Sequence, residues 1–298
     1  MAARRGIGRS ARLLALGPLF YLWRAPGTAI MLCLLVLILT ILTQVGGLLL
    51  WLGLPVLDLL GRTMPGSRIL RLLAAAGVFV PAYLAVSIVM IPPLAAQFGR
   101  VPLPCGPRNE TAYGALTVVT CLLNRHYATA AARDVLAATA KRWAADFPDG
   151  RLSFLDSGFP FFAWFPMLPH LSHGDGRKVD VALLFLDPAT GGPASGRAPS
   201  PIGYWGYVKP EVGATLPCGG RSTWLRWDFD WLQPLLPELR LDEAAVAALL
   251  QDLAASPRVV RIFVEPHISA RLGVKNRKIR FQGCAAARHD DHIHVEFR

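Results

Sequence analysis

Hydrophobic residues form two long unbroken runs in the first third of the chain. Residues 29–60 are a nearly uncharged stretch of 32 residues, and residues 73–96 form a second apolar run. About twenty consecutive apolar residues span the hydrocarbon core of a bilayer. The first run is too long for a cleaved signal peptide and poorly suited to buried core helices. We therefore expect residues 1–99 to be a membrane anchor of two or three apolar helical segments.

Residues 100–298 have shorter patterns, which begin after a linker marked by Pro102, Pro104 and Pro107. Helical spacing of apolar residues predicts helices over 127–147 and 241–255. Shorter apolar or alternating runs predict strands over part of 151–165 and over 178–186, 259–264, 279–282 and 292–297. Strands interleaved with two main helices are typical of an α+β domain. We expect a compact domain with a small antiparallel sheet and flanking helices, preceded by N-terminal transmembrane helices.

Charge is unevenly distributed, although the whole chain carries a formal net charge of +11. Residues 1–99 hold eight Lys or Arg residues and one acid, whereas the remainder holds 23 basic and 19 acidic residues. Basic residues beside apolar spans usually face the cytoplasm. A nucleic-acid interface would need a basic stripe with interleaved aromatic residues in the domain, and we find none. We expect the lipid bilayer to be a partner and nucleic acid not to be one.

Topology depends on how residues 29–60 fold. With two plain spans, residues 100–298 would remain in the cytoplasm, and Arg62, Arg68 and Arg71 would face outward against the positive-inside rule. A helical hairpin broken at residues 44–47 would keep every basic cluster inside and deliver the domain to the outer face. Both arrangements remain open, and the outer face is favoured.

Cysteines bear on the compartment. Cys33 lies in the first apolar run, and the domain holds Cys105, Cys121, Cys218 and Cys284, without the CxxC spacing of a zinc finger. Two disulfides in an oxidising periplasm would fit, with Cys105–Cys121 a feasible pair. Four reduced cysteines in a cytosolic domain remain the alternative.

Histidines concentrate in two stretches of the domain. In the predicted C-terminal strand, His292 and His294 point to one face while Ile293 and Val295 point to the other. Two imidazoles side by side on a rigid strand suit a metal ion. His267 follows another predicted strand, and we expect it to be structural.

The second histidine stretch precedes the predicted strand 178–186. His173 lies in a Gly-rich turn, and Asp180 lies among apolar strand residues, where a carboxylate is costly to bury unless it is paired or ligating. Catalytic zinc usually has three protein ligands and one open position. We expect the two stretches to meet and to hold one Zn²⁺ ion through His173, Asp180 and His294.

Two motifs carry a resemblance to a known family. Ser172-His173 is followed by six residues and Asp180, and the chain ends in His289-x-x-His292-x-His294. This constellation resembles the penicillin-insensitive murein endopeptidase family, in the wider group of lysostaphin-type, D-Ala-D-Ala and hedgehog-like zinc folds. It covers roughly residues 150–298. The resemblance implies that His173, Asp180 and His294 are zinc ligands, that His292 is catalytic, and that His170 and His289 line the site.

The resemblance also implies an activity. We expect a membrane-anchored zinc peptidase that hydrolyses a D-amino-acid peptide bond in peptidoglycan, at the bacterial inner membrane with a periplasmic catalytic domain. A D-Ala-D-Ala type carboxypeptidase, a non-catalytic zinc-stabilised binding module at the cell envelope and a membrane scaffold with incidental histidines remain alternatives. The membrane region departs from the simple secretion signal of the family. No HExxH motif is present, so the base that activates water stays open.

Residues for substrate contact are less defined by the pattern. Trp164, Tyr204, Trp205 and Tyr207 could line a peptide groove or belong to the core. Arg177, Lys178 or Lys209 could bind a substrate carboxylate or be solvated surface residues.

Overall fold

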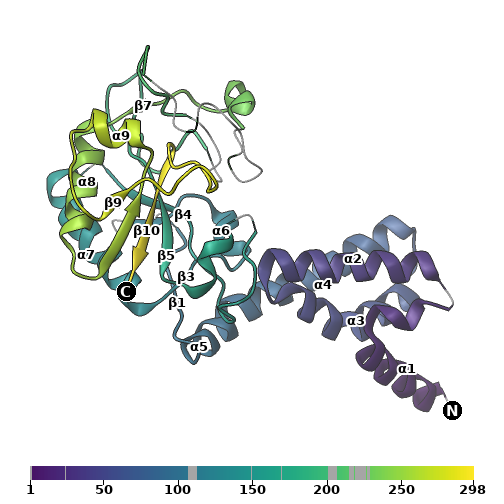
Figure 1. Cartoon of the computed structure of the whole chain (residues 1–298). Coiled ribbons are helices and arrows are strands. Elements are labelled where there is room, and N and C mark those ends of the chain that lie inside the picture. Colours follow the sequence, from purple (N-terminus) through teal and green to yellow (C-terminus); the bar gives the residue numbers. More distant parts are fainter. Residues whose placement is uncertain are drawn as a thin grey trace.

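A helical bundle and a mixed α+β domain make up the computed structural model of the chain (Figure 1). The structure describes residues 2–23, 25–106, 113–148, 150–168, 170–200, 207–214, 218, 226 and 229–298. The bundle contains α1 (Ala2–Leu16), a 3-10 helix (Gly17–Tyr21), α2 (Pro26–Thr43), α3 (Gly46–Thr63), α4 (Arg68–Ala85), a π-helical turn (Val86–Met90) and α5 (Ile91–Ala96).

Three helices of the bundle are long and apolar enough to cross a membrane: α2, α3 and the continuous helix over residues 68–96. The helices α2 and α3 form a hairpin, one of the two arrangements that the sequence left open, because Gln44 adopts a φ of 65° directly after α2. Close packing of the two helices requires a glycine at position 47. A Cβ atom there would lie 2.2 Å from the carbonyl oxygen of Val36. The predicted break at residues 44–47 is confirmed.

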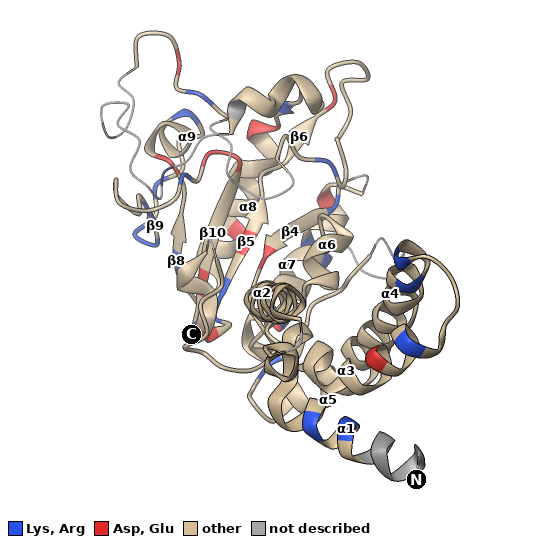
Figure 2. Cartoon of the chain, turned by 90° about the vertical axis from the view of Figure 1, so that its right-hand side faces the viewer, with Lys and Arg blue, Asp and Glu red and all other residues tan. Residues whose placement is uncertain are grey.

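The helix α1, which carries Arg9 and Arg12, and the connection between α3 and α4, which lies between Arg62 and Arg68, are at the end of the bundle away from the domain (Figure 1). Lys and Arg residues are coloured blue in Figure 2. Asp58 joins the basic residues of the two segments, because it accepts hydrogen bonds from Arg9 at 2.7 Å and lies 3.1 Å from the Arg62 guanidinium. Tyr21 donates a further hydrogen bond of 2.6 Å to the same carboxylate. The hairpin therefore places the N-terminal helix and the α3–α4 connection on one side of the bundle.

The main sheet of the domain has six strands in the order β2-β4-β5-β10-β8-β9. Their bounds are β2 Tyr113–Ala115, β4 Leu152–Asp156, β5 Lys178–Ala182, β10 His292–Phe297, β8 Val259–Phe263 and β9 Ile279–Arg280. The α+β class is confirmed, but the expectation of a small antiparallel sheet is wrong at both edges, where β2–β4 and β8–β9 run parallel. Helices α7 (Ala130–Asp146) and α9 (Pro266–Arg271) lie within these two connections, so the chain crosses over and returns in the same direction.

Two further pairs of strands are short. The strand β1 (Val101–Pro102) pairs with β3 (Tyr127–Ala128), and β6 (Phe185–Leu186) pairs with β7 (Arg240–Leu241). The predicted strand 178–186 is therefore divided between two sheets. Among the described residues, the other helical elements of the domain are α6 (Val118–Leu122), α8 (Glu243–Ala255) and 3-10 helices at Leu171–Asp175 and Asp230–Leu235.

One face of the main sheet is apolar and forms the core. Val181, Ile293 and Val295 are at most 2% exposed and belong to one hydrophobic cluster with residues of α7 and α8. Because strand side chains alternate, the same two central strands present Asp180, His292 and His294 on the opposite face. The core helices thus fix the face on which the candidate site forms.

The connection between bundle and domain differs from the expected linker. The strand β1 lies within it, Leu103 is buried, and Arg100 is buried while its Nη2 donates a 2.8 Å hydrogen bond to the carbonyl oxygen of Gly174. Arg100 also donates to the carbonyl oxygen of Asp175. Pro107 lies outside the described residues. The junction is therefore a packed and hydrogen-bonded part of the fold.

Two disulfides join Cys105 to Cys121 and Cys218 to Cys284, while Cys33 is free in α2. The structure thus has the disulfide-bonded arrangement and not four reduced cysteines. The first disulfide closes the short loop that the cysteine spacing made feasible.

Candidate metal centre

The candidate site begins with two central strands of the sheet. In the antiparallel pair β5–β10, His294 lies directly opposite Asp180, and His292 lies opposite Ala182. Opposed residues share a face of the sheet with adjacent side chains. Sequence spacing alone predicted that His292 and His294 share one face of the strand. The strand register shows that Asp180 lies on that same face of the sheet.

His173 reaches these residues from the 3-10 helix Leu171–Asp175, which ends at Gly176 in a left-handed conformation with φ of 65°. Its Nε2 atom lies 3.2 Å from Oδ1 of Asp180 and 3.1 Å from Nδ1 of His294. The third edge, from His294 Nδ1 to Asp180 Oδ1, is 2.8 Å. Ligand atoms of a tetrahedral zinc ion bound at about 2.05 Å lie ~3.3 Å apart. The three donor atoms therefore fit one small metal ion.

The backbone fixes which nitrogen of His173 faces the site. Nδ1 of His173 lies 2.6 Å from the carbonyl oxygen of Ser157, which can only accept a hydrogen bond. Nδ1 therefore carries a proton, and Nε2 faces Asp180 and His294. Such a carbonyl partner is a common second-layer support for metal-binding histidines. A backbone carbonyl has no residue signature, so the sequence did not indicate Ser157.

His170 contacts the other oxygen of Asp180. Its Nδ1 atom pairs with Oδ2, while Oδ1 faces His173 and His294. By geometry His170, His173 and Asp180 also form a group able to hold a metal ion. We assign His170 to orienting the Asp180 carboxylate, because ligation through Oδ1 leaves Oδ2 for a hydrogen-bond partner.

Asp180 is completely buried, which by itself disfavours its charged form. The neighbouring rings of His173, His170 and His292 outweigh this effect and hold the pKa of Asp180 well below its usual range. Asp180 is therefore an anion inside the domain. A buried carboxylate of this kind needs a cationic partner, which a metal ion would supply.

His292 adjoins the donor atoms. Its Nδ1 atom lies 2.6 Å from Oδ1 of Asp291, and its Nε2 lies 4.0 Å from Oδ1 of Asp180. Nε2 is buried and has no hydrogen-bond partner within the described part of the chain. Burial disfavours the imidazolium, but the carboxylates of Asp291 and Asp180 outweigh it and raise the pKa of His292 to about 9. His292 is therefore protonated, and it faces the three atoms of His173, Asp180 and His294 that could bind a metal ion.

The sequence did not reveal the role of Asp291. Its strand face excluded it as the base, but it lies just before β10, where its carboxylate orients His292. The acid directly before the histidine was the available signal. His289 lies nearby, with its ring centroid 5.0 Å from that of His292 and with a pKa lowered well below its usual value mainly by burial. All six candidate residues are therefore brought together: His170, His173, Asp180, His289, His292 and His294.

Other residues considered from the sequence have structural partners. Glu296 pairs with Arg261 at 2.7 Å, and Lys178 pairs with Asp175 at 2.9 Å. The Tyr207 hydroxyl donates to the Leu239 carbonyl oxygen at 2.6 Å, which favours a core role. His267 contacts the carbonyl oxygen of Val208, as expected of a structural histidine. Trp164 is 77% exposed. Tyr204 and Trp205 lie outside the described residues.

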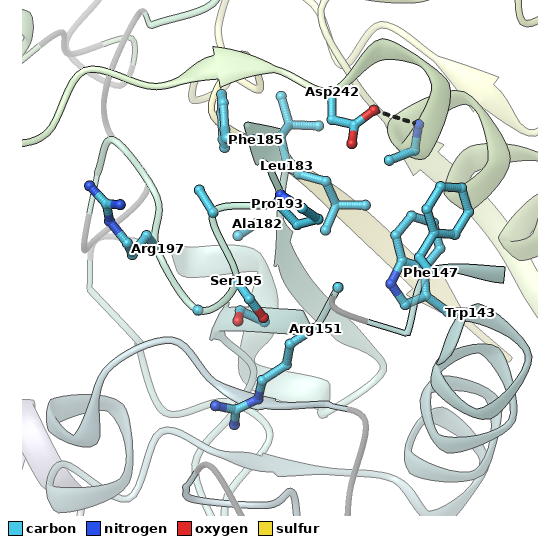
Figure 3. A pocket seen from close by; sticks show the side chains of 16 residues that line it. Trp143, Phe147, Arg151, Ala182, Leu183, Phe185, Pro193, Ser195, Arg197 and Asp242 are labelled. Carbon is cyan, nitrogen blue, oxygen red and sulfur yellow. Dashed lines mark hydrogen bonds between the residues drawn. The ribbon is translucent and has the colours of Figure 1, made fainter. Parts of the chain in front are cut away.

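A separate pocket lies beside α7 and the start of α8 (Figure 3). Trp143 and Phe147 line it, and the Asp242 carboxylate accepts a 3.0 Å hydrogen bond from the Ala245 amide as the cap of α8. None of the six candidate residues is among the lining residues. This pocket is therefore distinct from the candidate site.

A buried ion pair supports the strand next to Asp180. Arg125 Nε donates a 2.9 Å hydrogen bond to Asp156, which lies opposite Asp180 in the β4–β5 register. Arg125→Ala would leave the Asp156 carboxylate buried without its partner, so we expect the free energy of unfolding to fall by about 3 kcal/mol. Urea denaturation measures this change. Arg142→Ala, which breaks an exposed pair with Asp252, is the control and should cost less than about 1 kcal/mol; equal losses would contradict the prediction.

A second group that could hold a metal consists of Cys105, Cys121 and His126. Its two cysteines form a disulfide, so no thiolate is available there.

His126 makes the free energy of unfolding depend on pH. Burial lowers its pKa to about 4, below the ~6.5 of an unfolded histidine. The unfolded chain therefore binds the proton first, and stability is lost as pH falls from 6.5 to 4, by about 3 kcal/mol. Urea denaturation of wild type and His126→Gln across this range should show a flatter profile in the variant.

Comparisons with protein-family models and with curated proteins bear on the family of the chain. No protein-family model matches the chain. No curated protein matches its sequence. The functional argument therefore depends on the site itself.

Proposed function

We propose that the chain is a membrane-anchored zinc peptidase that hydrolyses a D-amino-acid peptide bond in peptidoglycan. The observation that carries this proposal is the convergence of His173, Asp180 and His294 within 3.2 Å of one another. The motif spacing pointed to the same three residues. Two imidazoles and one carboxylate are a ligand set of catalytic zinc sites.

The residues of the chain have separate parts in this proposal. His173, Asp180 and His294 would hold the ion, and a bound Zn²⁺ ion supplies a Lewis acid that polarises a carbonyl group and acidifies water. His292, kept protonated by Asp291, donates a hydrogen bond or a proton from Nε2 to the reacting amide. His170 holds the Asp180 carboxylate in place.

We place the domain on the periplasmic side of a bacterial inner membrane. Two observations support this orientation. The helix α1 and the α3–α4 connection, where the described basic residues Arg9, Arg12, Arg62 and Arg68 lie, are at the end of the bundle away from the domain (Figure 1), which the positive-inside rule assigns to the cytoplasm. The two disulfides of the domain are typical of an oxidising compartment.

Metal removal tests the proposed function. The full chain in detergent should cleave crosslinked muropeptides, lose that activity after chelation and dialysis, and regain it on addition of one equivalent of Zn²⁺. Elemental analysis before and after dialysis measures the metal content. A chain that binds one zinc per molecule yet cleaves neither crosslinked nor D-Ala-D-Ala peptides would contradict the proposal.

One observation favours a second function, a non-catalytic zinc-stabilised binding module. His173, Asp180, His292 and His294 are all at most 3% exposed, as expected of a closed structural metal site. This alternative expects zinc to raise the melting temperature without any peptide hydrolysis. The same chelation experiment therefore separates the two functions.

A further inference from the structure

Two exposed apolar surfaces of the domain lie next to the helical bundle. The first consists of Val118, Val119 and Leu122 on α6, which are between 41% and 62% exposed. The second consists of Phe98, Phe162 and Trp164, between 45% and 77% exposed. We call these six residues the junction surface. None of them carries a charge, and exposed clusters of this kind usually mark an interaction site.

Hydrogen bonds tie α6 to the third candidate span. The Tyr83 hydroxyl donates to the Leu122 carbonyl oxygen at 2.6 Å. The Asn124 side chain donates to the Tyr83 hydroxyl at 2.9 Å and to Ser87 at 3.3 Å. In both views α6 lies beside the bundle (Figures 1 and 2). Its exposed side chains are therefore level with residues 83–87 of the helix.

The aromatic part of the junction surface is tied to the hairpin. The Phe161 amide donates a 2.9 Å hydrogen bond to the side-chain carbonyl of Gln44, at the tip between α2 and α3. The Phe98 ring, two residues after α5, lies 5.2 Å from the Phe161 ring and 5.8 Å from the Phe162 ring. One part of the surface is thus fixed to residues 83–87 of the third candidate span, and the other to the tip between the first two.

The length of the helix over residues 68–96 determines how deep in a bilayer these contacts would lie. A helix rises 1.5 Å per residue, so about twenty residues cross the ~30 Å hydrocarbon core of a bilayer. With Arg68 at one edge of the core, the other edge lies at about residue 88 of the 29-residue helix, next to Tyr83 and Ser87 and before α5. Burial agrees, because α4 has no buried residue, whereas Ser87, Ile91 and Ala95 are buried.

We propose that the junction surface is seated in the interfacial layer of the bilayer that the three helices cross. Its partner is the boundary between lipid headgroups and acyl chains. This layer favours amphipathic and aromatic side chains such as Trp164. Each of the six side chains is between 41% and 77% exposed, so contact with this layer would remove apolar surface from water at all six positions.

Nitroxide labelling of the full chain in phospholipid nanodiscs tests the proposal. In a Cys33→Ser background, Val119→Cys and Trp164→Cys are labelled separately, and the collision rates with oxygen and with a water-soluble nickel chelate are measured. Leu34→Cys on an exposed position of α2 is the lipid reference. Val212→Cys, an exposed apolar position in the domain, is the aqueous reference.

We expect both labels to show at least a threefold lower nickel collision rate than the Val212 label, with oxygen rates approaching that of the Leu34 label. A nickel rate equal to that of the Val212 label at either position overturns the proposal. The readout needs neither bound zinc nor hydrolysis, so its outcome is independent of the proposed peptidase activity.

Discussion

Asp180→Ala is expected to leave the purified chain without stoichiometric zinc and without peptidase activity. Asp180 provides the only carboxylate among the three converging donors, and its Oδ1 atom lies within 3.2 Å of both partners. Structural zinc sites bind with about 10–16 kcal/mol shared over their ligands, so loss of one ligand should cost at least ~3 kcal/mol, more than a hundredfold in affinity. Elemental analysis and zinc titration measure this loss.

Thermal unfolding gives an independent readout of the same variant. Zinc at a hundred times its dissociation constant should stabilise the wild-type chain by about 2.7 kcal/mol, and the variant should show no such shift. Glu296→Ala is the matched control, because Glu296 lies on the same strand face but pairs with Arg261. It should retain one zinc ion. Unchanged zinc content in Asp180→Ala would show that the metal assignment is wrong.

His292→Ala is expected to keep its zinc and to lose about a thousandfold in kcat, which corresponds to ~4 kcal/mol of transition-state stabilisation. The physical reason is the position of Nε2, which is buried, without a hydrogen-bond partner among the described residues, and 4.0 Å from Asp180 Oδ1. Steady-state cleavage of muropeptides together with metal analysis separates this effect from loss of the ion.

Asp291→Asn provides the conservative companion to this variant. Its carboxylate helps to raise the pKa of His292, so its removal should lower that pKa and move the alkaline limb of the pH–rate profile to lower pH. His267→Ala, at a histidine that contacts the Val208 carbonyl oxygen, should retain activity. A fully active His292→Ala variant would contradict the catalytic assignment.

Alternation of side chains made part of the site predictable. The strand β10 has the predicted bounds His292–Phe297, because Ile293 and Val295 alternate with two histidines. Asp180 stood out as a charge within an apolar run. The glycines after Gln44 likewise predicted the turn of the hairpin. In each case a local pattern and the tertiary fold impose the same requirement.

Other features depend on contacts between distant segments, which local patterns do not encode. The parallel edge pairs follow from the crossovers through α7 and α9, and the strand after Lys178 is divided because Phe185 pairs with Leu241. Ser157 supports His173 through a backbone carbonyl that any residue would supply. Pro102 looked like part of a linker, but it forms a strand with Tyr127.

The hydrogen bonds from Arg100 to the turn of the candidate metal centre have a consequence for how the protein meets a ligand. They connect the residues directly after α5 to the carbonyl oxygens of Gly174 and Asp175, without a flexible linker between them. A domain of this size is about 40 Å across. The candidate metal centre would therefore stay within a narrow range of distances from the bilayer surface. Encounter would then be a two-dimensional search by lateral diffusion. The distance that a ligand can extend from its own attachment point would then determine whether it reaches the candidate metal centre, because the domain does not move relative to its helices.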